Sequence, residues 1–233
     1  MNDEFLKVMM NTEVVRLPRQ DLATFGTTIV TYNVITRPLY EAIDADKRRE
    51  ESVLRRGTVK AERPKIVTPG YLSRSAGFGS EAQEFLLDLV RRGYADDPGL
   101  LYSYSNEPGG MEIIGARPEE LAERISADID RESRSREAVL LGVDELWDVS
   151  LMKFIFDLTN RSAPGNMSEL MGAGRLDNDD GIPADARMRI NSLIQQMQRG
   201  EIDPESVHRE LEAWQVFEQY EDTFFRALRL RSR

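Results

Sequence analysis

The stretch that decides the fold is TTIVTYNVIT, residues 27–36. It is dense in β-branched and aromatic residues, which are enriched in strands. Alternate residues of a strand point to opposite faces, and here both sets are largely apolar. A strand with two apolar faces is typical of a sheet that is covered on both sides. The stretch therefore predicts a central strand, which ends before Pro38.

The segments around this strand predict a small antiparallel sheet. Strand-like runs at 12–17, 52–61, 65–68 and 100–105 are rich in β-branched or aromatic residues. Gly57 predicts either a turn or a bulge. The turn residues Pro108-Gly109-Gly110 predict a hairpin that leads into a further strand at 111–114. Between these strands, the residues from Ser80 to Gly93 predict one amphipathic helix.

From Pro118 onward the sequence predicts helices alone. Pro118 is followed by two glutamates, which is typical of a helix start. Apolar residues at helical spacing predict further helices over 143–158 and 184–199. Asp203 and Pro204 predict the start of a last helix that ends near Leu230. Four glycines, two prolines and an acidic cluster predict a flexible loop over 161–183.

These patterns together predict an α+β fold. We expect a small antiparallel β-sheet with a helix in the N-terminal half and an all-helical C-terminal half of about four helices. The expected division gives a mixed sheet-containing region, 1–117, and a helical region, 118–233. The sequence leaves open whether these regions are separate domains or two layers of one domain.

The composition excludes several kinds of chemistry. The 233 residues include 41 acidic and 31 basic side chains, with a formal net charge of -10. There is no cysteine, which excludes disulfides, thiolate nucleophiles and cysteine-based zinc sites. His208 is the single histidine, so sites that need several imidazoles are not expected. We expect no catalytic residues, no metal ligands and no cofactor; an enzyme based on carboxylates or lysine is a third alternative.

The hydropathy pattern bears on location. The sequence contains no run of about 18 apolar residues, the length that a membrane-spanning helix needs. The first residues, Met1-Asn2-Asp3-Glu4, lack the basic and apolar segments of a signal peptide. We therefore expect no membrane contact and a cytoplasmic location.

The last predicted helix carries the first candidate for a partner surface. Its apolar residues from Val207 to Leu228 recur about every 3.5 residues, the period of helices that wind around each other. Either this stripe packs on the chain's own helices, or part of it binds a partner or a second copy. Aromatic residues dominate the binding energy of protein interfaces. The expected partner-binding residues are Trp214, Phe217, Phe224 and Phe225, of which Phe225 is expected to be exposed.

The second candidate is a local excess of positive charge. Residues 47–65 contain eight basic and three acidic side chains, so this segment carries +5 within a chain of -10. The segment either protects a sheet edge, meets an acidic protein surface, or contacts nucleic-acid phosphates. Lys47, Arg48 and Arg49 begin it, and the candidate residues for nucleic-acid binding are Arg55, Arg56, Lys60, Arg63 and Lys65.

The sequence thus predicts a non-catalytic protein–protein binding or assembly protein that uses its amphipathic C-terminal helix. The alternative is a nucleic-acid-associated factor that uses the basic segment 47–65. The bulky C-terminal stripe and the segregated charge favour the first over the second, since the acidic remainder of the chain repels a polyanion.

Overall fold

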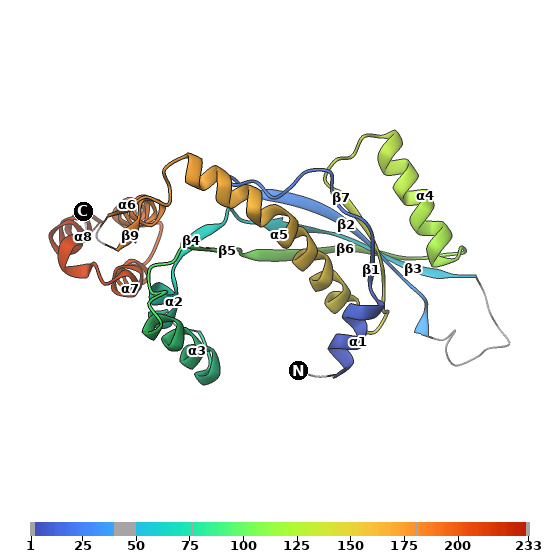
Figure 1. Ribbon diagram of the computed structural model, residues 1–233. Coiled ribbons are helices and arrows are strands. Elements are labelled where there is room, and N and C mark those ends of the chain that lie inside the picture. Colours follow the sequence, from blue (N-terminus) through green and yellow to red (C-terminus); the bar gives the residue numbers. More distant parts are fainter. Residues whose placement is uncertain (1–2, 40–49, 76, 180, 232–233) are drawn as a thin grey trace. The chain divides into compact units, whose positions relative to one another are not determined.

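The computed structural model describes residues 3–39, 50–75, 77–179 and 181–231 (Figure 1). The chain divides into two compact units, each built from two separate segments. Unit 1 comprises residues 1–63 and 102–166, and unit 2 comprises residues 64–101 and 167–233. This division differs from the one expected at residue 117, because strands from both sides of that position share one sheet.

A five-stranded mixed sheet forms the centre of unit 1. Its order is β1 (Glu13–Arg16), β7 (Glu137–Gly142), β2 (Thr28–Thr36), β3 (Ser52–Ala61) and β6 (Tyr104–Ile114). β2 lies in the middle, antiparallel to β3 and parallel to β7. The central strand predicted from its two apolar faces is therefore confirmed.

The prediction of a small antiparallel sheet was wrong because it missed β7. This strand lies in the region that we expected to be all-helical, and it pairs in parallel with β2 from Thr31 to Thr36. Its apolar run is only four residues long, Ala138 to Leu141. So short a run does not distinguish a buried strand from part of a helix. Pairing with β2, which is distant in the sequence, decides its conformation.

The hairpin predicted at Pro108-Gly109-Gly110 was also wrong. β6 runs through these residues without a turn and pairs with β3 along its length. β6 is an edge strand, where a proline can lie with its missing N–H on the unpaired side. Gly57 lies opposite Pro108, and the register between β3 and β6 shifts between Arg55 and Gly57. There Arg56 of β3 opposes two residues of β6, Gly109 and Gly110, so the extra residue of this bulge lies in β6 rather than at Gly57.

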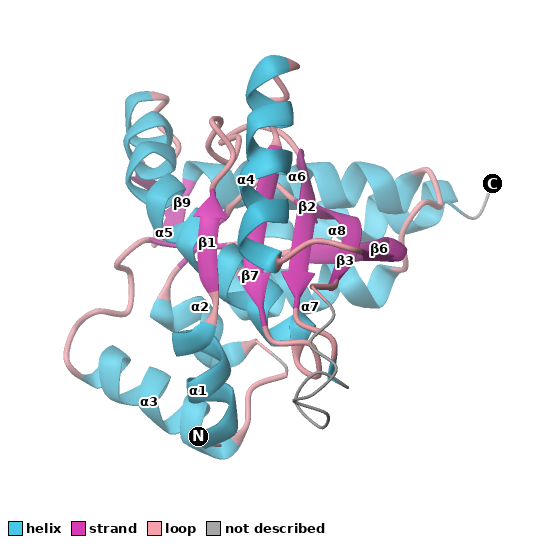
Figure 2. Ribbon diagram, turned by 90° about the vertical axis from the view of Figure 1, so that its right-hand side faces the viewer, coloured by secondary structure: helices cyan, strands magenta, loops and turns pink. Residues whose placement is uncertain are grey.

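Helices cover both faces of this sheet (Figure 2). α5 (Trp147–Gly172) packs on the face that carries Tyr32. α4 (Pro118–Arg131) starts at Pro118 as predicted and packs on the opposite face, which carries Ile35. The sheet therefore has one apolar core on each side, which explains why β2 is apolar on both faces.

α5 continues through residues that we expected to be a flexible loop. It includes 161–172, although Pro164 lacks the N–H that a helix interior normally uses. The Ser162 hydroxyl accepts the N–H of Leu22 at 3.0 Å, and the Asn166 amide donates to the Leu22 carbonyl at 2.8 Å. These bonds, one on each side of Pro164, hold the helix where the local sequence predicted a loop.

Unit 2 consists mostly of helices. Its helices are α2 (Pro69–Arg74), α3 (Ser80–Arg91), α6 (Ala184–Gln198), α7 (Pro204–Trp214) and α8 (Phe217–Arg231). Two short strand pairs accompany them: β4 (Lys65–Val67) with β5 (Gly99–Leu101), and β8 (Asn178–Asp179) with β9 (Ile182–Pro183). α6, α7 and α8 share an apolar core that includes Ile190, Leu211 and Phe224.

The predicted last helix is in fact two helices, α7 and α8. Asp203 caps α7 as predicted. The helix then ends at Trp214, because Gln215 takes the left-handed conformation with φ of 58°. α8 starts at Phe217 and packs back against α6 and α7. The single apolar stripe expected from the sequence thus becomes two surfaces that pack within unit 2.

Candidate binding surfaces

The four aromatic residues predicted to bind a partner all lie in unit 2, but they differ in exposure. Trp214 and Phe224 are 5 % and 6 % exposed and belong to the core of this unit. Phe217 packs against that core, and Phe225 is 42 % exposed. Most of the stripe is therefore used in internal packing, and Phe225 is the member that a partner can reach.

Phe225 belongs to an aromatic cluster where α7 and α8 meet. The ring centroids of Phe224 and Phe225 are 5.5 Å apart at an interplanar angle of 79°. Those of His208 and Phe217 are 4.7 Å apart at 63°. Phe217 also meets Phe225 edge-on, with centroids 6.5 Å apart. Such edge-to-face contacts are favourable beyond simple burial, so they hold the exposed ring in a defined position.

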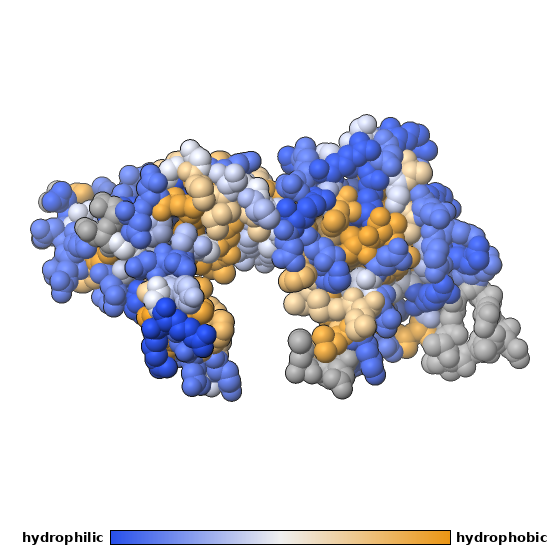
Figure 3. Space-filling view, viewed as in Figure 1, coloured by the Kyte–Doolittle hydropathy of each residue, from blue (hydrophilic) through white to orange (hydrophobic). Residues whose placement is uncertain are grey.

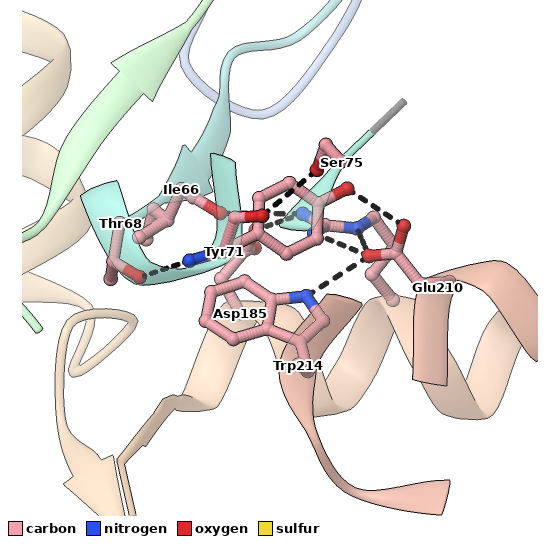
Figure 4. Close-up of polar contacts among 8 residues, drawn as sticks. Ile66, Thr68, Tyr71, Ser75, Asp185, Glu210 and Trp214 are labelled. Atoms are coloured by element: carbon pink, nitrogen blue, oxygen red, sulfur yellow. Dashed lines mark hydrogen bonds and ion pairs between the residues drawn. The ribbon is translucent and has the colours of Figure 1, made fainter. Parts of the chain in front are cut away.

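The carboxylate of Glu210, also on α7, is the centre of a polar network (Figure 4). Arg189 from α6 donates its Nε and Nη2 hydrogens to Oε1 of Glu210, at 2.9 and 2.6 Å. The indole N–H of Trp214 donates to the same oxygen at 3.1 Å. The hydroxyl of Tyr71 from α2 donates to Oε2 at 2.9 Å. One carboxylate therefore links three helices of unit 2.

The guanidinium of Arg189 also lies over the aromatic rings of Tyr71 and Trp214. The guanidinium carbon of Arg189 lies 5.8 Å from the Tyr71 ring centroid and 6.0 Å from that of Trp214. Burial, together with the charge of Glu210, raises the pKa of Tyr71 above its ordinary value of 10.0. The Tyr71 hydroxyl is therefore protonated at neutral pH and donates to Glu210. Because each charge has an opposite partner, the network stabilises packing rather than supplying a reactive group.

A pocket of about 430 Å³ opens in unit 2 beside this network. Arg74 from α2 lines it and donates its Nε hydrogen to the main-chain oxygen of Ala213 at 2.9 Å. Burial lowers the pKa of Arg74 from its ordinary 12.5, but an arginine stays charged at neutral pH. Arg209 and Glu212 line the same pocket. Its lining thus carries both signs of charge and favours no single ligand.

The basic segment is divided between the two units and partly neutralised. Arg55 donates to Oδ1 of Asp144 at 2.6 Å and to the Thr36 hydroxyl at 3.0 Å. Its guanidinium lies 5.8 Å from the centroid of Trp147. Both members of the Arg55–Asp144 ion pair are largely buried. Arg55 is therefore part of the packing of unit 1 rather than an open phosphate-binding group.

The other basic candidates do not gather beside Arg55. Arg56 forms an ion pair with Glu112 at 3.2 Å, and adjacent residues of a strand point to opposite faces. Lys60 lies on the same strand and is half-buried. Arg63 belongs to unit 1 and Lys65 to unit 2. Lys47, Arg48 and Arg49 lie outside the described residues.

A second pocket, of about 400 Å³, lies in unit 1 where the parallel strands β2 and β7 end. Thr36, Gly142 and Asp144 line it, and the Thr36 hydroxyl donates to Oδ1 of Asp144 at 2.6 Å. Arg37 and Glu119 at its rim form an ion pair at 2.5 Å. The carboxyl ends of parallel strands are a common location for ligands. Here Thr36 is hydrogen-bonded to Asp144, and Arg37 is paired with Glu119. These four side chains are therefore engaged with one another rather than directed at a ligand.

Sequence reasoning missed the residues that organise both units. Glu210 lies between Val207 and Trp214 in the apolar stripe of α7, and a carboxylate within such a stripe signals a buried ion pair. Asp144 follows the apolar run of β7, but it is recognisable as a strand-end residue only once that run is known to be a strand.

The described residues contain no group of three or more histidine, aspartate or glutamate side chains placed to hold a metal ion. Among the helices that the structure describes, none is long and apolar enough to cross a membrane. No family model, no curated protein and no solved structure matches this chain.

Proposed function

We propose that this chain is a non-catalytic protein–protein binding or assembly protein, and that its C-terminal helices supply a binding surface. The observation that carries this proposal is the exposed ring of Phe225, which Phe217 and Phe224 hold by edge-on contacts. Aromatic anchors dominate binding energy at protein interfaces. A ring that is already held in place loses little conformational freedom on binding, which favours affinity.

The charges around Phe225 support the same proposal. Glu221 and Asp222 lie one turn before it on α8, and Arg229 lies one turn after it. All three are exposed. An apolar anchor within a polar rim is the usual anatomy of an interface. Acidic residues on one side and a basic residue on the other would orient a partner that carries the opposite arrangement.

The nucleic-acid alternative has weaker support. Arg55 and Arg56 are paired with Asp144 and Glu112, and the chain as a whole carries -10. Fluorescence anisotropy with labelled duplex DNA at about 50 mM salt tests it, because phosphate contacts are strongest at low salt. The variant Arg56→Gln with Lys60→Gln leaves the buried Arg55–Asp144 pair intact. Binding that salt weakens, and that this variant abolishes, would favour the alternative.

The proposal is tested by site-specific photo-crosslinking of the full chain in its native host. Benzoylphenylalanine replaces Phe225, and in a matched control it replaces Gln219, which is also exposed on α8. We expect one discrete crosslinked protein from position 225 and none from position 219. Its identity is then read by mass spectrometry.

Two outcomes would contradict the proposal. If neither position yields a crosslinked protein, Phe225 does not meet a partner. If both positions yield the same mixture of products, contact with α8 is nonspecific, and the exposed ring of Phe225 is not an anchor.

A further inference from the structure

α3 in unit 2 is an amphipathic helix whose apolar side is only partly covered, since Ala82 and Phe85 are exposed and Leu89 is half-buried. Phe85 is 62 % exposed, and Leu86 is the one buried residue of this helix. α3 packs mainly against α2, a helix of six residues. Ala82, Phe85 and Leu89, spaced three and four residues apart, form an apolar strip beside the covered position. Figure 3 shows apolar residues at the surface of this part of unit 2.

Main-chain hydrogen bonds cap α3 at its carboxyl end. Gly93 takes a left-handed conformation with φ of 93°, and its N–H donates to the Val90 carbonyl at 3.1 Å. The N–H of Tyr94 donates to the Leu89 carbonyl at 3.1 Å. These bonds close the helix in the manner of a Schellman motif. The helix is therefore well formed at this end. The packing of an apolar strip normally supplies most of a helix's stability, and here Ala82 and Phe85 of that strip remain exposed.

The charges beside the strip indicate what covers it. Glu81, Asp88 and Arg92 follow one edge of the strip, at successive spacings of seven and four residues. The acidic end of this edge is at the start of α3 and the basic end is at its finish. A second copy of α3 that runs antiparallel along this edge would place Arg92 of the partner subunit beside Glu81 of the first copy. By symmetry, Glu81 of the partner subunit would lie beside Arg92 of the first copy. The edge is therefore complementary to itself about a two-fold axis.

We infer that α3 pairs with α3 of a second copy of this chain, antiparallel and about a two-fold axis. The strips of Ala82, Phe85 and Leu89 pack against each other across the axis. Glu81 of each copy meets Arg92 of the partner subunit at either end of the contact. Arg92 already pairs with Asp88 of its own chain at 2.7 Å, and its guanidinium has further N–H donors for the second carboxylate. This surface is separate from Phe225 on α8, so the two proposals fail independently.

The test is sedimentation equilibrium of the full chain between about 1 and 200 µM. We expect a reversible monomer–dimer equilibrium. Phe85→Glu is expected to weaken dimerisation by about 30-fold or more, since it places two charges at the centre of the contact. Phe156→Glu is the control, because Phe156 is 56 % exposed in unit 1. It should leave the equilibrium unchanged, and circular dichroism should show parental helix content for both variants.

A charge exchange tests the antiparallel register. Glu81→Arg alone and Arg92→Glu alone should each weaken the dimer by about 3- to 10-fold, as expected for exposed ion pairs formed twice. The double variant should restore parental affinity to within about two-fold. Glu84→Arg is the matched control, because Glu84 lies in the same helix but away from the strip, and it should have no effect.

Three results would overturn the inference. The first is a monomer at every concentration. The second is a dimer that Phe85→Glu does not weaken. The third is a double variant no better than its single variants, which would show that Glu81 and Arg92 do not face each other.

Discussion

Arg189 donates two hydrogens to one oxygen of Glu210, at 2.9 and 2.6 Å, and this ion pair joins α6 to α7 inside unit 2. Both side chains are largely buried. Removing one member of such a pair leaves the other charge without a partner in a poorly solvated place, which costs more than the pair itself contributes. The interaction is therefore expected to control the stability of unit 2.

Glu210→Ala should lower the free energy of unfolding of unit 2 by about 3 kcal/mol. It removes the acceptor of Arg189, Tyr71 and Trp214 together. Urea unfolding monitored by Trp214 fluorescence measures this loss in a Trp147→Phe background, because Trp147 belongs to unit 1. Glu212→Ala is the control: this exposed carboxylate should change stability by less than about 1 kcal/mol. Equal effects of the two variants would contradict the central role of Glu210.

Arg55→Met should lower the free energy of unfolding of unit 1 by about 2–3 kcal/mol, since Asp144 then loses its cationic partner and keeps the Thr36 hydroxyl as a donor. Trp147 fluorescence reports this change, because Arg55 lies over its ring. The adjacent Arg56→Met should cost less than about 1 kcal/mol, as its ion pair with Glu112 is exposed. The reverse order of the two effects would refute the assignment of Arg55 to the packed interior.

Gly57→Ala should destabilise unit 1 by about 1–3 kcal/mol through overpacking. A Cβ atom at this position would lie 2.6 Å from Cζ of the buried Tyr32 and 2.7 Å from the carbonyl oxygen of Glu107. Thermal unfolding measures the effect. Gly115→Ala, where a Cβ atom has no neighbour within 4 Å, serves as the control and should be close to neutral.

The stability of unit 1 should fall as the pH rises from about 10 to about 12. Burial, with a smaller contribution from Tyr104, raises the pKa of Tyr102 from 10.0 to about 12. In this range the unfolded chain has lost the phenol proton and the folded chain retains it, so the unfolded state binds fewer protons. The contribution is therefore fully present below pH 10 and is lost above it. Urea unfolding at pH 9, 10 and 11 should show a shallower decline for Tyr102→Phe; an identical decline would contradict this origin.

Gly165→Ala should raise the free energy of unfolding by about 0.5–1 kcal/mol, because alanine is the better helix former. Gly165 lies within α5, and a Cβ atom there meets nothing within 4 Å. Gly174→Ala is the contrasting variant: its φ of 66° is left-handed, so alanine should be destabilising there. A loss of stability in Gly165→Ala would mean that α5 does not continue through residue 165.

Parts of both units could be predicted from short stretches of sequence. The two apolar faces of β2, the proline that starts α4 and the aspartate that caps α7 each depend on neighbours within a few residues. The same holds for the exposure of Phe225 at the edge of its stripe. The organising residues Glu210 and Asp144 could not be assigned, because their partners Arg189 and Arg55 lie 21 and 89 positions away.

The sequence by itself determined that this protein has a central strand that is apolar on both faces and a C-terminal region rich in aromatic residues. It also located the starts of four helices, near Ser80, Pro118, Ala184 and Pro204. Only the tertiary structure decided that 137–142 is a strand, that α5 passes through Pro164, and that the C-terminal stripe breaks at Gln215. Each of these outcomes runs against or beyond local propensity. Each depends instead on hydrogen bonds and packing between segments distant in the chain: β7 on β2, Ser162 and Asn166 on Leu22, and α8 on α6 and α7.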